Sequence, residues 1–184
     1  MDYFTYKSFA YNFKASSFFL KNAETSKEGA YYNRLSSLLF SALTLESYIN
    51  HKGYEECTDW EKWDKEQKPS IKNKIKKLYT IYSKDVNFND KPFSTINILF
   101  KIRDEIVHGR TYIISKKIKN PPNNSKAAQS NVESTIERYC KIKKVKKFNK
   151  DIQSIIEMIN EDSNNKVSKS KLWSLGGGSF QVKR

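Results

Sequence analysis

The stretch LSSLLFSALTLESYIN, residues 35–50, carries the clearest periodic pattern in the sequence. Its apolar residues recur at intervals of three and four, which is the spacing of one face of an α-helix. The stripe consists of Leu35, Leu38, Leu39, Ala42, Leu45 and Ile49. The pattern predicts an amphipathic helix over about residues 30–51, with Gly53 as its stop signal.

Helical spacing also dominates the rest of the chain, and no strand–helix–strand alternation or β-hairpin signal appears. Further helices are expected over about residues 4–24, 69–82, 93–108, 128–142 and 149–160. Residues 119–126, KNPPNNSK, have the composition of a loop. The sequence therefore predicts an all-α, up-and-down helical bundle of about five to six helices.

The length of 184 residues fits one domain. We expect a helical domain over residues 1–160 and a mobile Lys/Ser/Gly-rich tail over residues 161–184. Within this tail, SLGGGSF (174–180) is not a phosphate-binding loop, because no Gly-Lys-Ser/Thr sequence follows it. The alternative to a flexible tail is a short peptide that docks on a partner through the flanking Trp173 and Phe180.

The chain has a formal net charge of +14, with 34 lysines and arginines, and arginine accounts for only five of them. Such a charge favours an anionic partner such as RNA, DNA or anionic lipid. The excess of lysine and asparagine is also what an AT-rich genome gives without selection for binding. Both explanations of the charge stay open at this point.

Several sequence features bear on where the protein works. No apolar run approaches the roughly 20 residues needed to cross a bilayer, so no membrane segment is expected. The N-terminus, MDYFTYKSFAYNF, lacks the basic-then-apolar layout of a signal peptide. Cys57 and Cys140 match no metal or redox spacing, which favours reduced, buried thiols. These features predict a cytoplasmic protein with no metal and no cofactor.

The segment FKIRDEIVHGR (100–110) places Arg103 and His108 in the last turns of the fourth expected helix. On an ideal helix these two residues lie about 140° apart in azimuth and about 7.5 Å apart along the axis. One helix alone therefore does not direct both side chains at one small target. Gly109 directly follows the histidine.

Arg103 falls in register with the apolar stripe of this helix, which comprises Phe93, Ile96, Leu99, Phe100 and Val107. An arginine on a buried face needs a carboxylate, a phosphate or an interface as a partner. Asp104 precedes His108 by four residues, so the two share a helix face and can form a hydrogen bond.

Together with SALTLESYINHKG (41–53), the Arg103–His108 segment resembles the HEPN family (higher eukaryotes and prokaryotes nucleotide-binding domains). This family is built from helical bundles, with an arginine, a polar residue and a histidine late in a long helix. The resemblance covers about residues 5–160. Asp104 stands where the family most often has asparagine, and Glu46 matches an inward-facing acidic residue of the preceding helix.

The resemblance implies a metal-independent endoribonuclease that acts as a bacterial toxin or an antiviral effector. It also implies a homodimer in which two Arg-His motifs converge on one cleft, which would resolve the azimuth problem. His108 would be the general acid/base and Arg103 the clamp on the scissile phosphate. Asp104 would orient either residue, and Glu46 would be an inward partner of Arg103. Products would carry a 2′,3′-cyclic phosphate and a 5′-OH.

Other basic residues are candidates for RNA binding. Family members silenced by tyrosine adenylylation carry a tyrosine two residues after the histidine, where this chain has Arg110. We therefore expect Arg110 to contact phosphate. We also expect the activity to be regulated by a partner protein other than an adenylylating enzyme, either an antitoxin or a defence-system component. The densest basic run, KIKKVKKFNK, lies between the fifth and sixth expected helices and is either an RNA track or a solvated face. Its candidate RNA contacts are Lys141, Lys143, Lys144, Lys146 and Lys147.

Two other functions remain open from the sequence. The first is a non-catalytic HEPN module that binds a partner or drives assembly. The second is a basic helical protein that binds nucleic acid without chemistry, whose binding would weaken with salt and would not depend on His108.

Overall fold

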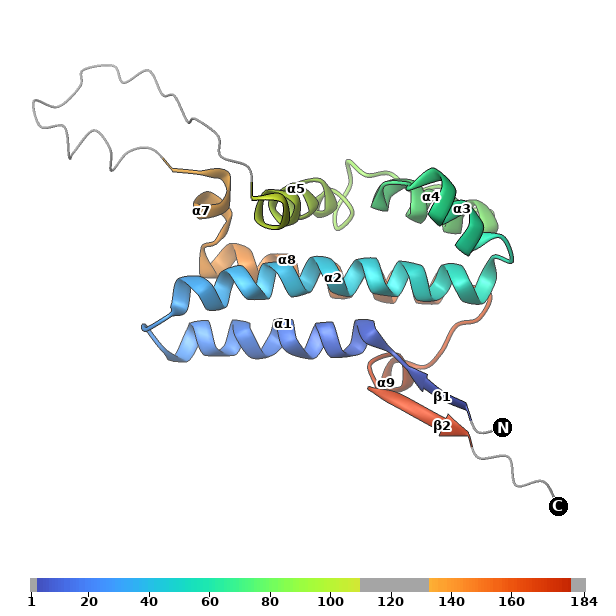
Figure 1. Cartoon of the computed structure of the whole chain (residues 1–184), viewed down its shortest axis with the longest axis horizontal. Coiled ribbons are helices and arrows are strands. Elements are labelled where there is room, and N and C mark those ends of the chain that lie inside the picture. The colour runs from blue at the N-terminus through green and yellow to red at the C-terminus, as the bar shows by residue number, and fades with distance from the viewer. Residues whose placement is uncertain (1–2, 110–132, 180–184) are drawn as a thin grey trace, which may run out of the picture.

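Helix α2 is the centre of the molecule (Figure 1). The structure is a computed structural model that describes residues 3–109 and 133–179. Helix α1 packs along one side of α2, helices α3, α4 and α5 cover the other side, and α8 lies behind it. The elements in chain order are β1 (Tyr3–Tyr6), α1 (Ser8–Thr25), α2 (Ala30–Glu56), α3 (Trp60–Gln67), α4 (Ile71–Ile81), α5 (Thr95–His108), α7 (Thr135–Tyr139), α8 (Ile142–Asp162), α9 (Lys169–Leu172) and β2 (Gly176–Ser179).

The predicted all-α class is confirmed, with eight helices in the described part of the chain. The two helices beyond the expected number are the short α3 and α9. A two-stranded antiparallel ribbon was not expected. It joins β1 to β2, so that Tyr3 pairs with Ser179 and Tyr6 pairs with Gly176.

The apolar stripes predicted from spacing form most of the core. In α2, Leu38, Ala42, Leu45 and Ile49 are fully buried, and Leu35 packs at the edge of the core. In α8, Ile152, Ile155, Ile156 and Ile159 follow the same spacing and are also buried. Burial of these side chains is the main free-energy gain that holds the helices together.

A buried polar cluster joins three of the helices at the centre of the bundle. The Ser16 hydroxyl of α1 donates to Oδ1 of Asn149 in α8 (2.6 Å) and lies 2.9 Å from the Ser41 hydroxyl of α2. Nδ2 of Asn149 donates to the Ser37 hydroxyl (3.0 Å). Because buried polar groups must find partners, this cluster fixes the register of α1, α2 and α8.

Gly53 does not end α2, contrary to the sequence prediction, and the helix continues to Glu56. The glycine instead makes room for the buried indole of Trp60, which begins α3. A Cβ at position 53 would lie 2.0 Å from Cε2 of Trp60. The absence of a side chain therefore serves packing between α2 and α3 and does not terminate the helix.

We expect Gly53→Ala to lower the free energy of unfolding by about 1–3 kcal/mol, because the indole or the helix must shift. At an open helical site the same change would instead stabilise by up to about 1 kcal/mol. Chemical denaturation of the two proteins measures the difference. In a Trp60→Leu background the substitution should cost much less, and an equal cost in both backgrounds would contradict this explanation.

The basic run KIKKVKKFNK is not a link between helices, as the sequence suggested, but forms most of the first half of α8. Val145 and Phe148 are buried and extend the stripe of Ile152 toward the N-terminus of the helix. Their spacing of three and four residues continues the helical period. The surrounding lysines concealed this pattern in the sequence.

Residues 161–175, predicted as the start of a mobile tail, are packed against the bundle. Leu172 in α9 is only 2% exposed. The Trp173 ring lies 4.2 Å from the Phe13 ring of α1, measured between centroids. Asn160 holds the segment from the other side, since its Nδ2 donates to the Val167 carbonyl (2.8 Å). Trp173 thus docks on its own chain, and the folded unit extends beyond residue 160.

Candidate active site at the end of α5

Helix α5 ends at His108, and Gly109 follows in the left-handed conformation (φ 52°). That conformation favours glycine and stops the helix at the histidine. His108 therefore occupies the last helical position, and its side chain is exposed.

Arg103 lies between α5 and α2, where it meets the carboxylate expected from the sequence. Its Nη2 is 3.4 Å from Oε1 and 3.3 Å from Oε2 of Glu46. Its guanidinium carbon lies 5.1 Å from the centre of the Phe100 ring. The side chain remains 22% exposed. The predicted Glu46–Arg103 pairing is thus present, and the arginine side chain is only partly buried.

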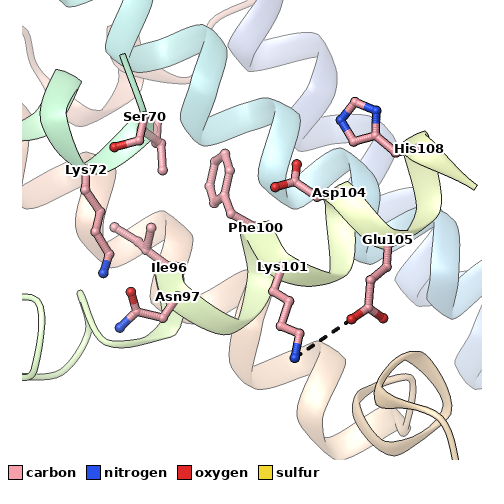
Figure 2. A pocket seen from close by; sticks show the side chains of 10 residues that line it. Ser70, Lys72, Ile96, Asn97, Phe100, Lys101, Asp104, Glu105 and His108 are labelled. Atoms are coloured by element: carbon pink, nitrogen blue, oxygen red, sulfur yellow. Dashed lines mark ion pairs between the residues drawn. The ribbon is translucent and has the colours of Figure 1, made fainter. Parts of the chain in front are cut away.

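Asp104 pairs with Arg103 and not with His108. Oδ1 of Asp104 lies 2.9 Å from Nη1 of Arg103. Asp104 and His108 project from the same side of α5 (Figure 2), but no hydrogen bond joins them. Of the two orienting roles that the sequence allowed for Asp104, the structure provides the one toward the arginine.

An open groove of about 800 Å³ runs between the start of α4 and the outer face of α5. Figure 2 shows His108 and Asp104 at one end of this groove and Ser70, Lys72 and Asn97 at the other. The lining residues are Ser70, Ile71, Lys72, Ile96, Asn97, Phe100, Lys101, Asp104, Glu105 and His108. Arg103 and Glu46 do not line it, so within one chain the arginine and the histidine serve different surfaces.

The apolar face of α5 differs from the predicted stripe at its C-terminal end. Val107 was expected to be buried but is 56% exposed, whereas Ile102 is fully buried. The reason is that α5 packs against α7 and α8 as well as against α2. The buried face therefore turns toward Ile102 near the end of the helix, and Val107 is exposed beside His108.

The lysines of the basic run mostly contact neighbouring groups of the same chain. Lys141 pairs with Glu133 (2.8 Å), Lys146 with Glu24 and Lys147 with Asp151. Nζ of Lys144 donates to the Arg138 carbonyl and lies 4.5 Å from the centre of the Tyr139 ring.

Lys143 has no such contact within residues 133–179 or 3–109, and Arg110 lies outside the described residues. Exposed ion pairs are worth about 0–1 kcal/mol each, so phosphates can compete with them.

Metal ligands, membrane-spanning helices and cysteines would each indicate another functional class. In the part of the chain that is described, no group of three or more His, Cys, Asp and Glu side chains is arranged to hold a metal ion. Over the same residues, every helix is too short or too polar to span a bilayer. Both cysteines are free thiols; Cys140 is buried, as expected, but Cys57 is partly exposed.

Comparison of the chain with protein-family models, curated proteins and solved structures found no match. The candidate site must therefore be interpreted from its own chemistry. Sequence reasoning singled out Arg103, Asp104, His108 and Glu46, but missed the groove residues Lys72 and Asn97. Only the approach of α4 to α5 brings these two side chains together, and no short-range pattern signals it.

Proposed function

We propose that this protein is a metal-independent endoribonuclease of the HEPN type that works as a homodimer. The observation that carries the proposal is the arginine held by two carboxylates, five residues before an exposed histidine that ends the same helix. A guanidinium fixed by Glu46 and Asp104 is oriented before substrate binds, which favours binding of a developing negative charge.

The proposed reaction uses the ribose of the RNA as its own nucleophile. One His108 accepts the proton of the 2′-hydroxyl, and the 2′-oxygen attacks the adjacent phosphorus. The bond between phosphorus and the 5′-oxygen breaks, and His108 of the second copy donates a proton to that leaving oxygen. Arg103 stabilises the charge on the phosphoryl oxygens. The products are a 2′,3′-cyclic phosphate and a 5′-OH.

In the proposed homodimer, the Arg103 and His108 side chains of both copies converge on one cleft, although they are separated within each chain. In one chain Arg103 faces α2, whereas His108 opens onto the groove and to solvent. Val107, which is 56% exposed, lies beside His108 on the surface that such a contact would cover. The biological role that fits this activity is a cytoplasmic toxin or antiviral effector, restrained by an antitoxin or another defence-system protein.

One observation favours the alternative of a non-catalytic binding or assembly module. The single positive charge of Arg103 is exceeded by the two negative charges of its partners, Glu46 and Asp104. A phosphate must therefore displace or share these partners. In a purely structural site, the same ion pairs would only tie α5 to α2.

Incubation of the purified protein with RNA in excess EDTA tests the proposal. Cleavage should persist without metal, and end analysis should find 2′,3′-cyclic phosphate and 5′-OH termini. A protein that leaves RNA intact would support the non-catalytic alternative, and cleavage only with added metal would refute the metal-independent mechanism.

We expect Arg103→Ala to lower the cleavage rate by about 100- to 1000-fold, the usual cost of removing one charge-stabilising donor. Arg103→Lys should lie between it and the wild type, because lysine keeps the charge but loses the planar fork. Rates at saturating RNA, together with thermal melting of each variant, separate this effect from unfolding. Equal cleavage by the wild type and Arg103→Ala would refute the proposed role.

A further inference from the structure

The groove between α4 and α5 has the size and the lining of a site for a flat organic group. Its volume, about 800 Å³, lies within the range of ligand pockets. Ile71, Ile96 and Phe100 form its apolar part, and Ile96 and Phe100 are themselves almost wholly buried. Their side chains are therefore held by the core and form the floor of the groove, whereas the partly exposed Ile71 offers more apolar surface to whatever enters it.

A hydrogen-bonding amide stands beside this apolar surface. Asn97 is exposed on α5, one residue after Ile96, and its side chain makes no hydrogen bond within the described residues. Figure 2 shows the Asn97 amide and the Lys72 ammonium at the same end of the groove. An amide offers one donor and one acceptor in one plane, which matches the N7 acceptor and N6 donor of adenine.

The charges around the groove suit a nucleotide chain rather than a free apolar ligand. Lys72 and Lys101 line it, and Lys101 is only loosely paired with Glu105 (4.0 Å). The two acidic residues, Asp104 and Glu105, lie toward the His108 end. Asp104 shares the single positive charge of Arg103 with Glu46, so this end of the groove remains negative. Lys72 lies away from these carboxylates and is the better contact for a phosphate, whereas Lys101 must exchange its loose contact with Glu105 for one.

The distance along α5 relates this surface to the proposed cleavage point. Asn97 and His108 are eleven residues apart, which corresponds to about 16 Å along a helix. A stacked strand rises about 3.4 Å per nucleotide, so about five stacked nucleotides, or fewer in an extended strand, span this length. One RNA strand can thus reach both ends of the groove.

We propose that the groove binds one adenine nucleotide of the RNA, a few nucleotides from the scissile phosphate. Asn97 recognises the adenine edge, Ile71, Ile96 and Phe100 contact the base, and Lys72 and Lys101 hold the flanking phosphates. This inference rests on the proposed ribonuclease function, because His108 defines where the strand is cut. On the edge that carries N7 and N6 in adenine, guanine presents two acceptors and uracil only its O4 acceptor, so neither offers Asn97 a donor–acceptor pair on that edge.

Binding of 2′-O-methyl oligonucleotides tests the inference without cleavage, since these strands lack the nucleophilic hydroxyl. Fluorescence anisotropy with the wild-type protein should show at least about fivefold tighter binding of oligo(A) than of oligo(U), as expected for a bidentate base contact. Asn97→Ala should abolish this preference. Asn73→Ala, an exposed asparagine of α4 that does not line the groove, should retain it. Lys101→Ala should weaken both strands alike, because a phosphate contact does not depend on the base.

Equal binding of the two strands by the wild type, or a preference that survives Asn97→Ala, would overturn the inference. Displacement of oligo(A) by AMP at equal nucleotide concentration would also overturn it, because the groove would then take free nucleotide rather than RNA. The EDTA cleavage assay is independent of these outcomes. Cleavage without base preference would reject the adenine site alone, whereas an Asn97-dependent preference without cleavage would reject the nuclease.

Discussion

We expect His108→Ala to lower the rate of RNA cleavage by about 100- to 10,000-fold, which is the usual contribution of a general acid/base. In the proposed dimer the substitution removes both the base and the acid, so the loss should lie toward the upper end. The side chain is exposed and makes no hydrogen bond or ion pair within the described residues. Its loss should therefore change the free energy of unfolding by less than about 0.5 kcal/mol. Single-turnover cleavage and thermal melting measure the two effects.

The other histidine is the matched control. His51 lies in α2, where its Nε2 is 3.1 Å from Oε1 of Glu55, and it does not line the groove. His51→Gln should leave cleavage within about twofold of the wild type. Wild-type activity in His108→Ala, or an equal loss in both variants, would remove His108 from the mechanism.

Replacement of Lys52 by methionine should lower the free energy of unfolding by about 3–5 kcal/mol, the cost of leaving a buried charge unpaired. Lys52 is 1% exposed, and so is the side chain of its partner Glu56. Its ammonium lies 3.0 Å from Oε2 of Glu55, 3.4 Å from Oε1 of Glu56 and 2.8 Å from the Asn165 carbonyl. Methionine fills a similar volume but provides none of these donors.

The surroundings of Lys52 offer little to replace the lost charge. Tyr82, another neighbour of the Glu56 carboxylate, cannot supply a positive charge. Burial, with a further contribution from that carboxylate, raises the pKa of Tyr82 and keeps its hydroxyl neutral. The Asn165 carbonyl belongs to the segment after α8, so its packing against the bundle should also loosen. Equilibrium denaturation measures the loss, and limited proteolysis tests whether residues 163–175 become accessible.

The control is the same replacement at Lys76, an exposed lysine of α4. The free energy of unfolding of Lys76→Met should stay within about 0.5 kcal/mol of the wild-type value. Combining Lys52→Met with Glu56→Gln removes the uncompensated carboxylate and should recover part of the stability. A Lys52→Met protein as stable as the wild type would show that the two glutamates do not need this ammonium.

Much of the fold could be predicted because helix formation depends on the spacing of neighbours in sequence. The stripe of α2 and the positions of α4 and α8 were predicted from three- and four-residue intervals. The errors occurred where a distant partner overrides a local signal. Gly53 was predicted to end α2 because glycine often follows the last residue of a helix. Its actual role is to leave room for the Trp60 indole. The ribbon of β1 and β2 had no local signal, since Gly176, Gly177 and Gly178 have little strand propensity.

In the candidate site, too, some features follow from the local sequence and others only from tertiary packing. The sequence by itself determined that Arg103, Asp104 and His108 lie near the end of one helix, and that Arg103 requires a partner, because helical geometry and the cost of burying a charge are local properties. The tertiary structure alone determined that this partner is Glu46 together with Asp104, and that α4 and α5 enclose a groove ending at His108. Those contacts depend on how helices far apart in sequence pack, and packing is set by the shapes of both faces rather than by either stretch of sequence.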